Sequence, residues 1–345
     1  MKSDVKQKPM VDIIAVSKAA KVSISTVSRS FNHPHLVNPA TRKKIDRAVK
    51  KLGYIRNRAA QSMHGRRSGT IGLIVPTINH TIFSEVIQSF SNAVEEMGFT
   101  ILITSHGYDL DREYAVLRKL MEHRVDGIAV TGLEHSEDSY QLIAQQNTPA
   151  LAIWNYSDAA PIACVGVDNT AAGRMAAEHL VSLGHRDIAL IFPQTHGNDR
   201  AHDRLIGAMS CLQKHGITVP DNRRIEVPYS ISQAKAACGQ LLAQPNRPTA
   251  ILCGNDVIAH GALYAAQKAG VAVPGALSLI GIGDFQGSED MEPALTTIAI
   301  PAQHIGDVAG KQLARMIMDQ ISGPLRHKCD LACIVRETTA RPWGA

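Results

Sequence analysis

The chain has 345 residues, of which 45% are hydrophobic and 19% are charged, so it is long enough for two or three domains with sizeable cores. No stretch of eighteen apolar residues occurs, which excludes a typical membrane-spanning helix. The N-terminus lacks the apolar segment of a secretory signal, and the six cysteines are scattered without metal-like spacing. We therefore expect a cytoplasmic protein with free thiols and with neither a bound metal nor a cofactor.

Charge is divided unevenly along the chain. Residues 1–67 carry sixteen Lys and Arg against three Asp and no Glu, a net charge of +13. The remaining 278 residues carry a net charge of −8. A cationic segment of this kind attracts phosphate polyanions, because binding releases their condensed counterions. The charge pattern favours a nucleic-acid partner for the N-terminal part of the chain.

The N-terminal segment also has the pattern of a helix-turn-helix. Residues 15–32 predict two short helices joined by a tight turn, with Asp12 capping the first helix and Ser23 capping the second. A third helix is predicted over residues 39–52, with proline in its first turn and glycine after its end. Three such helices would close a small core over residues 10–56.

The second helix has side chains suited to reading duplex DNA. If its N-terminal turn enters the major groove, Ile24, Ser25 and Arg29 lie near base edges, where arginine can pair with guanine through two hydrogen bonds. Hydroxyl and amide side chains beside them would contact phosphates and fix the register: Ser23, Thr26, Ser28 and Asn32. The alternative is a helical cap that only dimerises the rest of the chain, which leaves the net charge of +13 unexplained.

From Thr70 onward, strand-like runs alternate with amphipathic helices. The first series of strands falls at 70–76, 99–104, 126–131 and 149–154, and the second at 162–167, 187–192, 224–227, 249–253 and 277–282. Continuous apolar strands separated by helices predict parallel sheets covered on both faces, here in two similar lobes. A strand at 295–300, a helix at 302–319 and residues 329–335 would return the chain across both lobes. Ligands of such sheets bind beyond the carboxyl ends of the strands, here in a cleft between the lobes.

Several motifs resemble the lactose-repressor (LacI/GalR) family over nearly the whole chain. They include V-S-I-S-T-V-S-R (22–29), the basic stretch 42–63, G-T-I-G-L-I-V-P (69–76), V-G-V-D-N (165–169) and P-A-L-T-T-I (293–298). The resemblance implies an N-terminal all-α helix-turn-helix domain (10–56), a hinge helix or linker (57–68) and an α/β, two-lobed, periplasmic-binding-protein-like domain with parallel sheets (69–345). It places one lobe at about 69–167 and 301–328, and the other at about 168–298 and 329–342.

The resemblance also implies a function. It predicts a homodimeric, nucleoid-associated repressor that binds a near-palindromic operator in double-stranded DNA, with a small effector in the cleft controlling DNA affinity. Residues 57–64 would form a hinge helix in the minor groove, with Asn57, Ala60 and Met63 as contacts. Family members usually have leucine at the position of Met63, and methionine is also apolar and able to unstack a base step. Lys21 stands where the turn of the family usually has glycine.

Five residues match positions where family members line the effector cleft: Phe83, Asn155, Asp168, Arg204 and Asp256. The forked donors of Arg204 suit hydroxyls or a carboxylate. Structural alternatives stay open for four of these residues. Arg204 could form an ion pair on the helix surface, and Asp256 could cap the helix predicted at 256–269. Asp168 could be an inter-lobe structural residue, and Phe83 could belong to the core.

The effector class is inferred from a departure from the family pattern. G-I-G-D-F (281–285) occupies the place of a family G-F-D-D pattern, so Gly283 replaces the usual sugar-binding aspartate. Losing a carboxylate removes repulsion toward an anionic ligand, and residues 107–111 and 126–136 look most like the gluconate-repressor branch. We therefore expect a sugar-type effector, and among these a sugar acid such as gluconate or a ketogluconate; a neutral sugar or a nucleoside is the alternative.

Two other functions are disfavoured by the sequence. A sugar-binding protein for uptake would share the two lobes, but it predicts a secretory signal and no basic segment. We expect no enzyme and no catalytic residues, because no nucleophile–base pair, metal cluster or phosphate loop is present in the sequence. His33, with Pro34 and His35, predicts a turn rather than a metal site. His106, which follows the second predicted strand, could face the cleft, but we expect it to be exposed to solvent.

Overall fold

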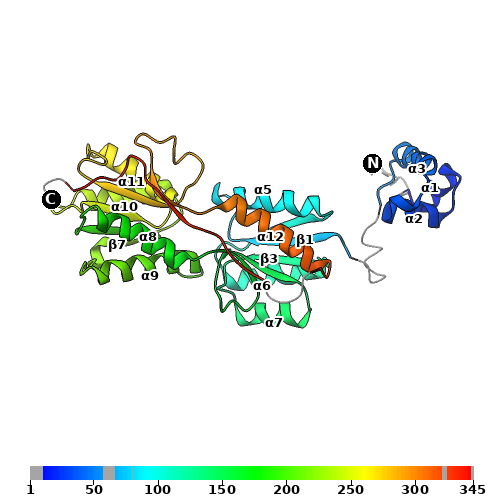
Figure 1. Cartoon of the computed structure of the whole chain (residues 1–345), viewed down its shortest axis with the longest axis horizontal. Helices are drawn as coiled ribbons and strands as arrows, with labels where there is room; N and C mark the ends of the chain where they lie inside the picture. Colours follow the sequence, from blue (N-terminus) through cyan, green and yellow to red (C-terminus); the bar gives the residue numbers. More distant parts are fainter. Residues whose placement is uncertain (1–10, 57–66, 80, 321–324, 343–345) are drawn as a thin grey trace, which may run out of the picture. The chain divides into compact units, whose positions relative to one another are not determined.

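The structure is a computed structural model and describes residues 11–56, 67–79, 81–320 and 325–342. The chain forms two compact units, Met1–Ser68 and Gly69–Ala345 (Figure 1). Among the described residues, no helix combines the length and the apolar character needed to cross a membrane. The predicted hinge contacts Asn57, Ala60 and Met63 lie outside the described residues.

The smaller unit is a three-helix fold. Its elements are α1 (Ile13–Ala20), α2 (Ile24–Asn32), the 3-10 turn η1 (Pro34–Leu36) and α3 (Pro39–Leu52). The two predicted caps are confirmed: Asp12 Oδ1 accepts a hydrogen bond from the Ala15 amide at 2.8 Å, and Ser23 Oγ accepts one from the Thr26 amide at 3.1 Å. The helices enclose a small apolar core, made of Val16, Ala20, Val27, Ile45 and Ala48.

The turn between α1 and α2 depends on a left-handed residue. Lys21 has φ +54° and ends α1, and its amide donates to the Lys18 carbonyl oxygen at 3.3 Å. A non-glycine residue adopts this conformation at a cost of about 1 kcal/mol. The turn therefore keeps the left-handed geometry that glycine favours while it carries a lysine.

The first lobe of the larger unit is an open sheet in the order β11-β5-β4-β3-β1-β2. Its strands are parallel: β1 (Thr70–Val75), β2 (Thr100–Ser105), β3 (Gly127–Thr131), β4 (Ala150–Asn155), β5 (Ala163–Val167) and β11 (Arg326–Lys328). Figure 1 shows helices on both sides of this sheet. One side has α5 (Thr81–Glu96) and α12 (Ala302–Ile317), and the other has α6 (Leu110–Glu122) and α7 (Glu137–Gln145).

The second lobe repeats this architecture in the order β12-β10-β9-β8-β6-β7. Its strands are β6 (Ile188–Pro193), β7 (Arg224–Val227), β8 (Ala250–Cys253), β9 (Ser278–Gly283), β10 (Thr296–Ala299) and β12 (Ala332–Ile334). Its helical elements are α8 (Asn169–Ser182), α9 (Asp199–Lys214), η2 (Asp221–Arg223), α10 (Ile231–Leu242) and α11 (Asp256–Lys268). The predicted two-lobed fold with parallel sheets is therefore confirmed.

Three segments pass from one lobe to the other. They join β5 to α8, β10 to α12, and β11 to β12. The short strand β11 was not predicted, because R-H-K carries no apolar pattern. The segment 329–335, which was predicted to cross back between the lobes, includes β12. This strand pairs antiparallel with β10, and this is the one antiparallel pairing in the described sheets.

Helices α8 and α9 pack closely through two glycines. A Cβ atom on Gly173 would overlap the backbone of Arg204, and one on Gly207 would overlap the backbone of Thr170. Only glycine permits this approach, so the packing brings the first turn of α8 next to α9. Asn169 and Arg204, on these two helices, are therefore held close to each other.

Asp256 forms a buried anchor within the second lobe. Its side chain is fully buried, and its carboxylate accepts hydrogen bonds from the Phe285 amide, Ser288 Oγ and Thr297 Oγ1 at 2.7–2.9 Å. Burial raises the pKa of Asp256, and these three hydrogen bonds oppose the rise. The alternative that Asp256 caps α11 is wrong, because the cap is Asn255, whose Oδ1 accepts the Ile258 amide at 2.9 Å. Asp256 instead ties α11 to β10 and to the loop after β9.

We predict that Asp256→Ala strongly destabilises the second lobe. The substitution leaves three buried donors without their acceptor, which should lower the free energy of unfolding by about 3 kcal/mol or more. Urea denaturation followed by circular dichroism measures this change. Asp290→Ala removes an exposed carboxylate from the same loop and should change stability by less than about 0.5 kcal/mol. Equal effects of the two substitutions would contradict the anchor.

Candidate nucleic-acid interface and ligand site

One face of α2 is exposed and carries the side chains predicted to read bases. Ile24, Ser25 and Arg29 are exposed, whereas Val27 and Ser30 on the opposite face are buried. The cap at Ser23 fixes where α2 begins, and the Lys21 turn sets its direction from α1. The helix therefore offers a guanidinium, a hydroxyl and an apolar side chain on one surface.

The predicted phosphate contacts form hydrogen bonds with one another. Ser23 Oγ lies 2.8 Å from both Ser25 Oγ and Thr26 Oγ1. Asn32 Nδ2 donates to Ser28 Oγ at 3.2 Å, and Asn32 Oδ1 accepts from Arg56. These contacts orient the four polar side chains, and their role toward phosphates stays a prediction.

Helix α3 adds a cationic surface to the same unit. Its side chains Ile45 and Ala48 are buried, and its basic side chains are exposed: Arg42, Lys43, Lys44, Arg47, Lys50 and Lys51. Six exposed cations on a short helix give a strong positive potential, which suits a polyanionic partner.

A cavity of about 300 Å³ lies between the two lobes of the larger unit. It is lined by residues that follow strands of both sheets: Thr77, Gly107, Tyr108, Gln194, His196, Asn198, Pro228 and Tyr229. Thr77 follows β1, Gly107 follows β2, and Pro228 follows β7. The cavity therefore occupies the carboxyl edge of the sheets, where α/β folds bind their ligands.

The cavity combines aromatic faces with polar atoms that have no partner. The rings of Tyr108 and Tyr229 stack with centroids 5.7 Å apart and planes 12° apart. The Tyr108 hydroxyl and Asn198 Oδ1 are buried and have no hydrogen-bond partner among the described residues. Burial raises the pKa of Tyr108 well above 10, so its hydroxyl keeps its proton. Since unpaired buried polar groups are costly, these two atoms suit a polar ligand.

Arg204 is buried beside this cavity. Only 2% of its side-chain surface is exposed, and Nε donates to Asn169 Oδ1 at 2.8 Å while a terminal nitrogen donates to the Gly254 carbonyl oxygen at 3.1 Å. Burial lowers its pKa, and Tyr108 and Tyr229 are close enough to influence it. The alternative of a surface ion pair is wrong, because Arg204 is buried and pairs with no carboxylate in the described part of the chain.

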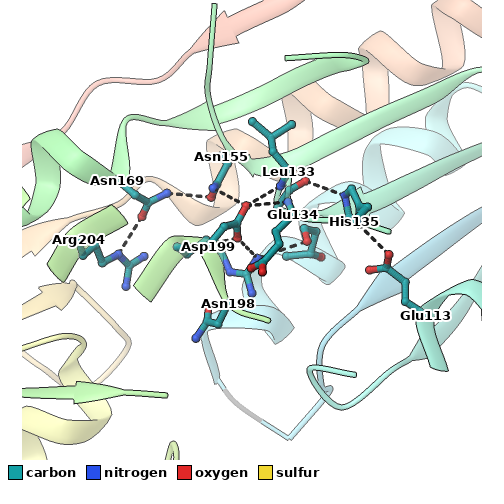
Figure 2. Close-up of polar contacts among 12 residues, drawn as sticks. Glu113, Leu133, Glu134, His135, Asn155, Asn169, Asn198, Asp199 and Arg204 are labelled. Atoms are coloured by element: carbon teal, nitrogen blue, oxygen red, sulfur yellow. Dashed lines mark hydrogen bonds and ion pairs between the residues drawn. The ribbon is translucent and has the colours of Figure 1, made fainter. Parts of the chain in front are cut away.

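A relay of hydrogen bonds runs from Arg204 through Asn169 and through Asn155 of the first lobe to Asp199 (Figure 2). Asn169 Nδ2 donates to Asn155 Oδ1 at 2.9 Å, and Asn155 Nδ2 donates to Asp199 Oδ2 at 2.8 Å. Asp199 belongs to α9 of the second lobe, and Asn155 ends β4 of the first lobe. We call Arg204, Asn169, Asn155 and Asp199 the inter-lobe relay.

Asp199 also accepts hydrogen bonds from the loop after β3. The amides of Leu133 and Glu134 donate to Asp199 Oδ2 at 2.6 and 3.2 Å (Figure 2). Arg200 pairs with Asp199 Oδ1 at 2.7 Å. His135 joins this loop to α6 through hydrogen bonds. Its ring nitrogens lie 2.8 Å from Glu113 Oε1 and 3.0 Å from the Gly132 carbonyl oxygen.

The other predicted effector residues lie outside the cavity lining. Phe83 is buried in the core of the first lobe, with its ring centroid 6.1 Å from that of Trp154. Asp168 caps α8 through the Ala171 amide at 2.8 Å and pairs with Lys328 at 3.3 Å. With Asn155 in the relay and Asp256 in its anchor, none of the five predicted residues is among the eight that line the cavity.

Sequence reasoning missed the lining residues themselves. The signal was available, because Tyr108 follows one predicted strand and Tyr229 follows another, on the edge where a ligand is expected. The expectation that His106 is exposed is wrong, since 3% of its side chain is exposed and Nε2 lies 3.6 Å from Glu113 Oε2. Burial lowers the pKa of His106.

Comparisons with known proteins match both units. Residues 13–57 match the family described as bacterial regulatory proteins, lacI family, and residues 177–339 match a periplasmic binding protein-like domain. The transcriptional regulator DegA of Bacillus subtilis is 34% identical over 297 residues, covering 85% of this chain and 88% of DegA.

Two further proteins extend this similarity. The transcriptional repressor PurR of Salmonella paratyphi B is 32% identical over 313 residues, covering 90% of this chain and 92% of PurR. The lac repressor dimer bound to operator and the anti-inducer ONPF is 28% identical with a TM-score of 0.85, covering 96% of this chain and all of that one. The chain therefore belongs to the lacI family of bacterial regulatory proteins, and it is a DNA-binding transcriptional repressor with an effector-binding domain.

Proposed function

We propose that this repressor binds a near-palindromic operator as a homodimer and changes its DNA affinity when a sugar acid, such as gluconate, occupies the cavity between the lobes. It would act in the cytoplasm, on the DNA of the nucleoid. The observation that carries the ligand class is the buried guanidinium of Arg204, which lies beside the cavity and pairs with no described carboxylate.

The exposed face of α2 supports sequence-specific reading of DNA. Arg29 can donate two parallel hydrogen bonds to a guanine, and Ser25 and Ile24 can add hydrogen-bond and methyl contacts. The cations of α3 would contribute attraction that does not depend on sequence. We also propose that Asn57, Ala60 and Met63 contact the minor groove, as the family resemblance implies.

The polar groups around the cavity support a hydroxylated, anionic effector. Buried charge is costly unless it is compensated, so Arg204 favours a ligand that brings a negative charge. Asn198 Oδ1 needs a donor such as a hydroxyl. The stacked rings of Tyr108 and Tyr229 offer an apolar surface for the C–H groups of a sugar chain.

The surroundings of Gly283 support the same class. A Cβ atom at this position would overlap the ring of Phe285, so an aspartate does not fit here unless Phe285 moves. The neighbouring carboxylate of Asp284 is compensated by Arg336, with 2.7 Å between Oδ1 and the guanidinium nitrogen. Asp256 is committed to its anchor. These carboxylates therefore leave little negative charge to repel a sugar acid.

The inter-lobe relay supports allosteric control. Arg204, at one end of the relay, is the group we expect to meet the effector carboxylate. Asp199, at the other end, holds the loop after β3 in the first lobe. A ligand that reorients Arg204 would therefore alter contacts between the lobes, and a change in lobe geometry can bias DNA affinity.

Arg29→Ala should weaken operator binding and relax base preference. The operator is first obtained by selecting random duplexes with the wild-type protein, and affinities are then measured by fluorescence anisotropy at fixed salt. The loss of binding free energy on the selected duplex should be about 1–3 kcal/mol, because the two hydrogen bonds to a base disappear. The loss on random DNA should be clearly smaller.

Lys51→Ala is the matched control for this experiment. Lys51 is an exposed cation on α3, so its removal should weaken binding to the selected duplex and to random DNA to the same extent. If Arg29→Ala also weakened binding to both duplexes equally, Arg29 would contribute charge alone and would have no part in reading bases.

Arg204→Gln should abolish the preference for an acidic ligand. Calorimetry with the wild-type protein should show gluconate binding at least about tenfold tighter than glucitol, the neutral polyol of equal chain length, since a charge-assisted hydrogen bond contributes about 1.5–3 kcal/mol. In the variant this ratio should fall toward one. The ratio stays informative even where the variant lowers both affinities through its lost contacts with Asn169 and Gly254.

Arg174→Gln is the control for Arg204→Gln. Arg174 is exposed on α8 and pairs with Glu178 at 3.4 Å, so its loss should leave both ligand affinities unchanged. Binding of a neutral sugar or a nucleoside with gluconate ignored would contradict the proposed ligand class.

Asp199→Ala should uncouple ligand binding from DNA binding. The substitution removes three hydrogen bonds to the first lobe, each contributing about 1 kcal/mol, so the ratio of DNA affinities with and without effector should shrink by about fivefold or more. Glu178→Ala, at an exposed site on α8, should leave the ratio intact. An unchanged ratio in Asp199→Ala would remove the relay from the allosteric mechanism.

A further inference from the structure

Three potential metal ligands from two separate segments meet in the first lobe. They are His304 in the first turn of α12, His327 in β11 and Cys329 immediately after β11. One ligand atom of each residue lies within 4.8 Å of the others, and the two imidazole centroids are 5.9 Å apart. No other group of three such side chains is found among the described residues. Cys329 is buried, His327 is half-buried and His304 is exposed, so the site is reachable from solvent.

We propose that His304, His327 and Cys329 bind a divalent transition metal ion of the zinc class. A thiolate and two imidazoles are ligands that Zn²⁺ prefers, at bond lengths near 2.3 and 2.1 Å. Such lengths place ligand atoms about 3.5 Å apart, so the cluster must contract by about 1 Å. Rotation of the exposed His304 side chain can supply much of this contraction. The cluster itself contains no carboxylate, which disfavours Mg²⁺ and Ca²⁺.

The backbone around the cluster is already fixed. Strand β11 pairs with β5, with His327 opposite Val165, and the Cys329 amide donates to the Gly166 carbonyl oxygen at 2.8 Å. On the other side, α12 packs against α5, where Gly306 allows close contact with Val86 and Phe90. Two of the three ligands therefore sit on a paired strand and its end, and the third sits on a packed helix.

The position of the cluster suggests what a bound ion would do. Cys329 begins the segment that leaves β11 in the first sheet for β12 in the second. A metal held by Cys329 and His304 would tie this crossover to α12. On binding, the thiol proton passes to solvent and the sulfur coordinates the ion. The ion would thus stiffen one of the three connections between the lobes, and this site does not rest on the proposed effector.

Cobalt titration of the full, untagged and reduced chain tests the proposal. Co²⁺ reports on zinc-class sites, because a bound thiolate gives a near-ultraviolet charge-transfer band. We expect one Co²⁺ per chain, displaced by Zn²⁺, with the band abolished in Cys329→Ser. His304→Ala and His327→Ala should each lower affinity by about tenfold or more, since even loss of an outer-shell partner costs 10- to 100-fold. His304 is exposed, so folding of that variant is not at risk.

Matched substitutions separate this site from others. Cys333→Ser removes the nearby half-buried thiol of β12, and His33→Ala with His35→Ala removes an exposed histidine pair whose rings lie 6.1 Å apart. These variants should bind Co²⁺ like the wild type. The proposal is overturned if the wild type binds no Co²⁺ or if the charge-transfer band survives in Cys329→Ser. It is also overturned if substitution of His33 and His35 abolishes Co²⁺ binding while His304→Ala leaves it intact.

Discussion

Four side chains are joined end to end by hydrogen bonds that cross between the two lobes. Arg204, Asn169 and Asn155 are almost completely buried, and the chain of donors and acceptors ends on Asp199. In a buried network each group depends on the orientation of the next, because an unpaired polar group away from water is costly. We propose that a ligand which takes a hydrogen bond from Arg204 weakens the bond between Arg204 and Asn169, and that this change reaches the contact between the lobes. Under this proposal, ligand recognition and lobe geometry are linked.

The two units differ in where they place their charged and polar side chains. The small unit has exposed cations on α3 and the exposed side chains of Ile24, Ser25 and Arg29 on α2, around a core of few apolar residues. The larger unit buries several polar groups around a cavity and a relay. The exposed cations of the small unit suit a polyanionic partner. The buried polar groups of the larger unit suit a small polar molecule. The uptake alternative loses its basis, because residues 13–57 match a regulatory family.

Local signals in the sequence predicted much of the fold. The caps at Asp12 and Ser23, the glycine after α3 and the apolar strand series each act over a few residues, so they can be recognised without tertiary information. The strand β11 was missed because its pairing with β5 comes from a segment far away in sequence. The partners of Arg204 were missed for the same reason, because Asn169 and Gly254 lie far from it in sequence. Spacing also hides the group of His304, His327 and Cys329, which only the packing of α12 against the sheet brings together.

The most direct measurement is the affinity of the full-length protein for its selected duplex, by fluorescence anisotropy at fixed salt, with and without saturating gluconate. The account predicts that gluconate changes the dissociation constant by about fivefold or more, as expected for coupled sites, and that glucitol at the same concentration changes it less. Gluconate that binds the protein in calorimetry while the DNA dissociation constant stays the same would contradict the account.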